Sequence, residues 1–346
     1  MSHKTPRLRC TVRCGAGILS GSSRGREWLW FPLCRRWLAG RRTLSGCYMK
    51  LHLGILAGWL LGGAAALALD TAKPAESERF DLGTVIDDAA VEKRLIAAAT
   101  ALIDSGKGVS VTTLAGQLER RSCAARLPEA GGKKLSAAEL IAQARPGVLV
   151  VAQTFLCGKC DKRHLSAASG VMLTAEGAFA TSYHVVNQKT NDVMLIMTGD
   201  GRIAPVTAVL AARRDADVAI LQAEGRGFTA LPLSTNAPAG LPVRVISHPD
   251  HNFYTLSEGV VSRQFVNRRR RGMEPVTMLA ITADFAKGSS GAPVFDDMGA
   301  VIGIVTSTIS TYYDTNNGRR DNLQMVFKHC IPSRYLLDLV RPEVKR

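Results

Sequence analysis

The chain has 346 residues, of which 46% are hydrophobic and 21% are charged. These values are ordinary for a globular protein, and they exclude a disordered chain, a collagen-like fibre and a membrane protein with several spans. The net charge of +15 is concentrated at the N-terminus, because residues 1–48 hold ten basic residues and one acidic residue. Residues 69–346 hold 33 basic and 28 acidic residues, a net +5, so no nucleic-acid partner is expected.

The first predicted element is a secretory signal peptide over residues 49–68. A short basic start, Met49-Lys50, precedes 17 uncharged, mostly apolar residues (53–69), and the small-residue pattern Ala66-Leu67-Ala68 offers a cleavage site. Residues 1–48 are then expected to be a spurious upstream extension. The alternative is a membrane anchor, because 17 residues are near the lower limit for a span. With the signal peptide removed, we expect a periplasmic or secreted protein without stable membrane insertion.

Residues 69–145 are expected to form a helical N-terminal segment. In 89–103, apolar residues recur at steps of three and four, which predicts a helix. A second, short helix is expected over 111–120. The capping-box pattern Ser136-Ala-Ala-Glu139 predicts the start of a third helix, which Pro146-Gly147 interrupts.

Residues 146–346 are expected to form an all-β domain. Short runs of β-branched residues alternate with turn residues, and about twelve such runs in roughly 200 residues predict a barrel or sandwich. A final amphipathic helix is expected over 331–340, with Pro332 in its first turn. The expected strands are 148–155, 169–174, 178–182, 193–197, 203–212, 217–222, 242–247, 255–266, 276–283, 292–295, 301–307 and 323–327.

Three segments of the β domain carry the residue types of a catalytic triad. His184 ends a strand, Asp217 precedes an apolar strand, and Ser290 lies in a Gly-rich turn. Each of them alone is common without a catalytic role, because such His and Asp residues usually lie at surfaces and in turns. Together they have the chain order His, Asp, Ser of chymotrypsin-type enzymes, whereas α/β-hydrolases and subtilisins have other orders.

These segments resemble trypsin-like serine peptidases of the bacterial HtrA type. The resemblance covers about residues 147–340 and implies a mainly β fold of two six-stranded antiparallel β-barrels, with the active site between them. The similar runs are ASGVMLTAEGAFATSYHVV (168–186), DADVAIL (215–221), TLSEGVVS (255–262) and KGSSGAPVF (287–295).

The resemblance implies an exported serine endopeptidase that acts on polypeptides through an acyl-enzyme and needs no cofactor. His184 would be the base and Ser290 the nucleophile. Asp217 would orient His184, and it is chosen over Asp215 because the family's second acid abuts the following strand. The backbone N–H groups of Gly288 and Ser290 would form the oxyanion hole. The alternatives are a non-catalytic binding module on the same barrels and a protein centred on a cysteine motif.

The sequence departs from the family pattern at several positions. Ala292 replaces a usual Gly, and Ser289 replaces the Asp with which digestive enzymes bind a newly cut N-terminus. Activation by N-terminal insertion is therefore not expected, nor is a PDZ domain, because the chain stops soon after Val340. Asp284 lies six residues before Ser290, and it forms either the base of an S1 pocket that selects Lys or Arg or a structural contact.

Four cysteines follow the leader, and they allow more than one chemistry. In an exported chain the main expectation is two disulfides, with three possible connectivities. The alternatives are a redox site and a metal site at Cys157, Cys160 and His164, with Cys123 or Cys330 as fourth ligand. The run Arg268–Arg271 is expected to be a solvated hairpin tip, with an acidic partner as the alternative. The sequence does not indicate an oligomeric state.

Overall fold

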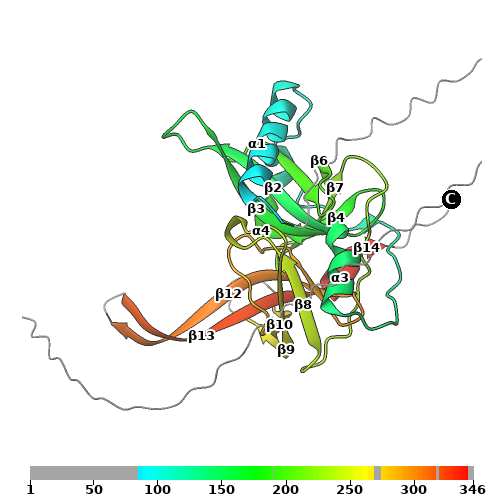
Figure 1. The fold of residues 1–346 in the computed structure, drawn as a ribbon, viewed down its shortest axis with the longest axis vertical. Helices are drawn as coiled ribbons and strands as arrows, with labels where there is room; N and C mark the ends of the chain where they lie inside the picture. Colours follow the sequence, from blue (N-terminus) through cyan, green and yellow to red (C-terminus); the bar gives the residue numbers. More distant parts are fainter. Residues whose placement is uncertain (1–84, 189, 269–273, 317–318, 342–346) are drawn as a thin grey trace, which may run out of the picture. The chain divides into compact units, whose positions relative to one another are not determined.

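The structure is a computed structural model that describes residues 85–341, except 189, 269–273 and 317–318 (Figure 1). For 314–316, 319 and 341 only the backbone is described. The predicted upstream extension (1–48), the predicted signal peptide (49–68) and most of the arginine run lie outside these residues. None of the described helices is both long enough and apolar enough to cross a bilayer.

In the described part of the chain, three α-helices precede the barrels, as expected. They are α1 (Asp88–Asp104), α2 (Val111–Ala115) and α3 (Ala137–Ala144). The predicted capping box of α3 is present, with both hydrogen bonds between Ser136 and Glu139. Helix α2 ends five residues before the predicted position, because Gly116, a poor helix former, takes its C-cap.

The first barrel contains six antiparallel strands in the closed order β2-β3-β4-β7-β6-β5. Successive residues of β2 enter two different apolar clusters, with Leu149 and Val151 in one and Val148 and Val150 in the other. This alternation follows from the two-residue period of a strand. Helix α1 packs against β2, β3 and β5 (Figure 1). The strands are β2 (Val148–Leu156), β3 (Arg163–Met172), β4 (Ala178–Ser182), β5 (Met194–Thr198), β6 (Ile203–Arg213) and β7 (Val218–Ala223).

The second barrel is also closed and antiparallel, with the order β10-β13-β12-β11-β8-β9. The expected fold class, two six-stranded antiparallel barrels preceded by a short helical segment, is therefore confirmed. The β12–β13 hairpin extends beyond the barrel (Figure 1). The strands are β8 (Pro242–Ser247), β9 (Thr255–Asn267), β10 (Val276–Ile281), β11 (Pro293–Phe295), β12 (Val301–Asn316) and β13 (Arg319–Pro332).

The predicted final helix over 331–340 is wrong in extent. Ile331 and Pro332 are the last residues of β13, where they pair with Ile304 and Gly303 of β12. Within 331–340, the helix is limited to α5 (Arg334–Leu337). The chain then forms β14 (Val340–Arg341), which pairs in parallel with β1 (Cys123–Ala124). Strand pairing with distant residues thus overrides the local amphipathic pattern.

Candidate active site

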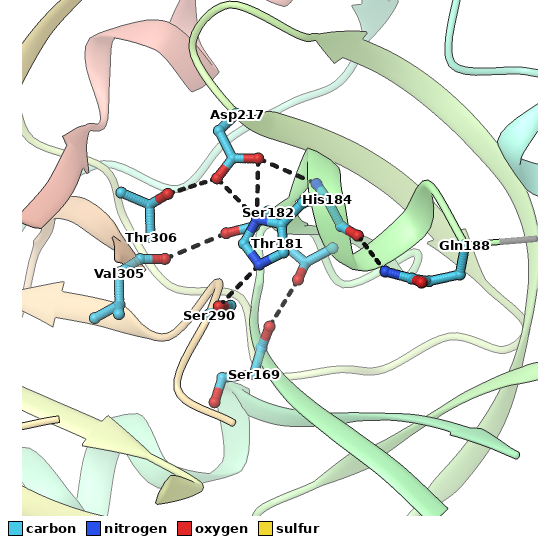
Figure 2. A network of polar contacts seen from close by, with 9 residues as sticks. All are labelled: Ser169, Thr181, Ser182, His184, Gln188, Asp217, Ser290, Val305 and Thr306. Carbon is cyan, nitrogen blue, oxygen red and sulfur yellow. Dashed lines mark hydrogen bonds and ion pairs between the residues drawn. The ribbon is translucent and has the colours of Figure 1, made fainter. Parts of the chain in front are cut away.

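The three predicted triad residues come from three separate segments that the barrels bring together (Figure 2). His184 lies in α4 (Tyr183–Val186), directly after β4. Asp217 directly precedes β7, and β4 and β7 pair in a register that sets Ser182 opposite Val218. This pairing holds His184 and Asp217 side by side. Ser290 comes from the second barrel, in the turn that precedes β11.

Asp217, His184 and Ser290 form a continuous hydrogen-bonded chain (Figure 2). His184 Nδ1 lies 2.9 Å from Asp217 Oδ2 and 3.1 Å from Oδ1. His184 Nε2 lies 3.0 Å from Ser290 Oγ. Because an ionised carboxylate only accepts hydrogen bonds, Nδ1 carries a proton, and in the neutral form of the ring this tautomer leaves Nε2 without one. Nε2 is then free to accept the hydroxyl proton of Ser290.

Asp217 is almost completely enclosed, with 3% of its side chain exposed. Burial opposes its ionisation, but the hydrogen bonds from His184 and Thr306 outweigh burial and hold its pKa below the usual value. Thr306 Oγ1 donates to Oδ2, and the backbone N–H of His184 donates to Oδ1 at 3.1 Å. Thr306 belongs to β12 of the second barrel, and the sequence analysis missed it because no local pattern marks it.

The turn that carries Ser290 is hydrogen-bonded to the first barrel. Ser169 of β3 donates from its backbone N–H to Ser290 O and from its hydroxyl to Gly288 O, both at 2.9 Å. Gly291 has φ +86°, and a Cβ there would lie 2.3 Å from Ser169 O. Only glycine therefore allows this close approach of the two barrels.

Two backbone N–H groups beside Ser290 are available to a ligand. Among the described residues, neither Gly288 N–H nor Ser290 N–H donates to a protein acceptor. The carbonyl of Lys287 accepts a hydrogen bond from Asp250 N–H at 2.6 Å. Because C=O and N–H point in opposite directions across a trans peptide, this bond turns Gly288 N–H away from Asp250.

The loop that holds the Lys287 carbonyl is itself attached to helix α1. Asp88 Oδ1 accepts a hydrogen bond from Phe253 N–H at 3.0 Å. Glu92 Oε1 contacts His251 Nδ1. Helix α1 therefore contacts the loop that contains Asp250, and Asp250 N–H in turn bonds to the peptide group that joins Lys287 to Gly288. The sequence carried no sign of this link, because the bonded residues are 159 and 165 positions apart.

A pocket of about 180 Å³ adjoins His184 and Ser290. Gln153 of β2, Ser166 of β3 and Lys287 are among the residues that line it. Gln153 is buried, and its Nε2 donates to Val185 O at 2.7 Å. The β2–β3 hairpin thus contributes directly to the wall of the pocket.

Asp284, the residue for which the sequence allowed an S1 role, has a lysine partner within its own chain. Its carboxylate lies 3.2 Å from Lys328 Nζ, and its side chain is 89% exposed. Lys328 Nζ also donates to Phe285 O at 2.7 Å. Asp284 does not line the pocket beside Ser290.

The two expected disulfides are absent among the described cysteines, all four of which are free thiols. Cys330 is completely buried in the apolar core of the second barrel, where burial raises its pKa. Cys123 is half-buried on β1. Cys157 and Cys160 lie close together, but their sulfurs are 3.5 Å apart, beyond the bond length of about 2.05 Å.

Two closed six-stranded barrels with His, Asp and Ser between them are the arrangement of the trypsin-like class. Residues 168–304 match the family model described as the trypsin-like peptidase domain, so the chain contains such a domain.

The chain is 28% identical over 184 residues to the anti-sigma-I factor RsgI9 of Acetivibrio thermocellus, covering 52% of this chain and 23% of that protein. It is 27% identical over 185 residues to "Protease Do-like 2, chloroplastic" of Arabidopsis thaliana, covering 52% and 29%. It thus spans less than a third of either relative.

Solved structures of HtrA-type proteases are also similar. The HtrA-type protease AlgW with tripeptide has 22% identity and a TM-score of 0.47, covering 59% of this chain and 62% of that one. The serine endoprotease from Yersinia pestis has 20% identity and a TM-score of 0.44, covering 60% and 65%.

Proposed function

We propose that the protein is a serine endopeptidase that cleaves polypeptides through an acyl-enzyme. The observation that carries this proposal is the hydrogen-bonded chain from Asp217 through His184 to Ser290, beside two unoccupied N–H donors. A serine hydroxyl is a weak nucleophile at neutral pH and needs a base within hydrogen-bond distance. His184 Nε2, 3.0 Å from Ser290 Oγ, meets that requirement.

In the first half-reaction Ser290 Oγ attacks the carbonyl carbon of the scissile bond and its proton passes to His184 Nε2. The negative charge that develops on the carbonyl oxygen is stabilised by the N–H groups of Gly288 and Ser290. Asp217 stabilises the resulting imidazolium from the other side of the ring. His184 then gives the proton to the leaving amine nitrogen as the C–N bond breaks, which leaves an ester on Ser290.

In the second half-reaction water replaces the amine. His184 takes a proton from the water as its oxygen attacks the ester carbon, and it returns that proton to Ser290 Oγ as the C–O bond breaks. The products are a carboxylic acid and the regenerated enzyme. No step of this proposed mechanism uses a metal or cofactor. We also propose that the protein is exported, because the sequence predicts a signal peptide over residues 49–68.

The direct test is covalent labelling with a fluorophosphonate. We expect one label per chain, which peptide mapping should locate at Ser290. The protein should also hydrolyse unfolded protein substrates, and chelators should not prevent this hydrolysis. Ser290→Ala should lose both label and hydrolysis while its thermal unfolding temperature stays close to that of the wild type. A folded wild-type protein that takes no label and cleaves no peptide library would favour the non-catalytic binding module.

Asp284→Asn is expected to change little. The carboxylate is exposed and already paired with Lys328, and such surface ion pairs are worth about 0–1 kcal/mol. We therefore expect kcat/KM for peptides with Arg or Lys at P1 to change by less than about fivefold. The same measurement with Leu at P1 is the control. A selective loss of cleavage after Arg and Lys would instead assign Asp284 to the S1 pocket.

Helix α1 is expected to affect kcat through the Lys287 carbonyl. Asp88→Ala combined with Glu92→Ala removes the contacts to Phe253 and His251. A hydrogen bond to a charged group contributes about 1.5–3 kcal/mol, so kcat should fall by about tenfold and at most about 10²-fold, with KM nearly constant. The control is Asp104→Ala, at the other end of α1. Equal losses in both variants, or an unchanged kcat, would contradict this role for the helix.

A further inference from the structure

The tip of the β2–β3 hairpin holds a cluster of metal-ligating side chains that peptide hydrolysis does not use. Cys157 Sγ and Cys160 Sγ are 3.5 Å apart, and Cys160 Sγ is 3.2 Å from His164 Nε2. One ligand atom from each of the three residues lies within 4.8 Å of those of the other two. The three side chains therefore converge on one point.

The separations fit a tetrahedral metal ion better than a disulfide. Zinc binds thiolate sulfur at about 2.3 Å and imidazole nitrogen at about 2.0–2.1 Å, which places two sulfurs about 3.8 Å apart and sulfur and nitrogen about 3.6 Å apart. The observed sulfur–sulfur and sulfur–nitrogen distances are within about half an ångström of these values. The spacing Cys-x-x-Cys, with a His four residues on, is also that of a zinc half-site.

The local backbone holds the three ligands in this arrangement. Gly158 has φ +69°, the left-handed conformation of a tight turn, and nothing lies within 4 Å of where its Cβ would be. Lys159 N–H donates to Cys157 Sγ at 3.4 Å. His164 sits in β3 opposite Phe155 of β2, and the two rings are in contact with centroids 5.5 Å apart. The turn thus places both sulfurs, and the strand pairing orients the imidazole.

We propose that Cys157, Cys160 and His164 bind one zinc ion, with the fourth tetrahedral position taken by water. Binding displaces the thiol protons of both cysteines, so that the metal is held by two thiolates and one neutral imidazole. The sequence offered Cys123 or Cys330 as the fourth ligand, but neither is part of the cluster. The ion would close the tip of the hairpin whose strands carry Gln153 and Ser166 to the pocket beside Ser290.

The test is a metal titration of the full chain, stripped of metal and kept reduced under anaerobic conditions. Co²⁺ should give a near-ultraviolet thiolate-to-metal band and the visible bands of a tetrahedral ion, and Zn²⁺ should displace it. Cys160→Ser should lose one equivalent of metal, and His164→Ala should weaken binding at least about tenfold. Because the chain has eight cysteines, Cys123→Ser is the matched control and should keep the full stoichiometry.

Hydrogen exchange gives a second readout that does not depend on peptidase activity. Zinc should slow exchange of the amides of 155–165 in the wild type and leave them unchanged in Cys160→Ser. The proposal is overturned if Cys160→Ser binds as much metal as the wild type. It is also overturned if reduced wild-type protein binds no metal at this hairpin. Either outcome leaves the proposed peptidase function unaffected, because neither measurement uses a substrate.

Discussion

Asp217→Asn is expected to lower kcat by about 10⁴ with the fold intact. The asparagine amide would donate to His184 Nδ1, so the imidazole proton would move to Nε2 and that nitrogen could no longer accept the proton of Ser290. Asp217 also accepts from His184 N–H and Thr306 Oγ1. An asparagine oxygen can keep the bond from His184 N–H, and the Thr306 hydroxyl can rotate to accept from the amide nitrogen. The loss should therefore appear in kcat, measured with a peptide substrate, and not in thermal stability.

The matched control is Asp215→Asn, two residues earlier. Asp215 forms an ion pair with Arg213 at 2.8 Å, and no bond links it to His184. We expect its substitution to change kcat by less than about threefold, because the ion pair is still partly exposed to solvent and does not contact the triad. Equal losses at the two positions would show that the assignment of Asp217 is wrong.

The losses within the triad should not add. His184→Ala introduced into Ser290→Ala should cost little further activity, because the nucleophile, base and orienting acid act as a unit. A residual rate above the uncatalysed reaction is expected from the N–H donors and substrate binding alone. Additive losses would indicate that His184 and Ser290 act in separate steps, contrary to the proposed mechanism.

Gly288→Ala is expected to lower kcat by about 10²–10³, the cost of losing one oxyanion donor. Gly288 has φ +95°, and a Cβ would lie 2.3 Å from the backbone oxygen of His248. The turn must then rotate, which breaks the bond from Asp250 N–H to the Lys287 carbonyl and redirects Gly288 N–H. KM should change little, because the donor stabilises the oxyanion more than the bound substrate.

Gly240→Ala separates this effect from backbone strain. Gly240 has φ +87°, and nothing lies within 4 Å of its added Cβ, so alanine there meets the left-handed strain without a clash. We expect normal kcat and a small loss of thermal stability in this variant. A Gly288→Ala enzyme with wild-type kcat, or equal kcat losses in both variants, would rule out the proposed oxyanion hole.

Local patterns in the sequence alone predicted a β domain, either a barrel or a sandwich. Alternating apolar residues predict strands, and the capping box at Ser136 predicts the helix that the structure contains. The order His184, Asp217, Ser290 pointed to chymotrypsin-type enzymes, and the resemblance of the surrounding runs to HtrA-type peptidases implied the two barrels. Where a local pattern competed with long-range pairing, as at Ile331 and Pro332, the prediction from sequence was wrong in extent.

Only the tertiary structure decided how the site is supported. Thr306 reaches Asp217 across 89 residues of chain, and Asp88 reaches Phe253 across 165. No local periodicity encodes such contacts, because they depend on how the two barrels and helix α1 pack. The surroundings of the cysteines likewise depend on the tertiary structure and could not be predicted from local sequence. Their number suggested disulfides, whereas strand pairing buried Cys330 in a core and brought Cys157 and Cys160 beside His164. Distances between side chains depend on strand register, which is set by the packing of the whole barrel.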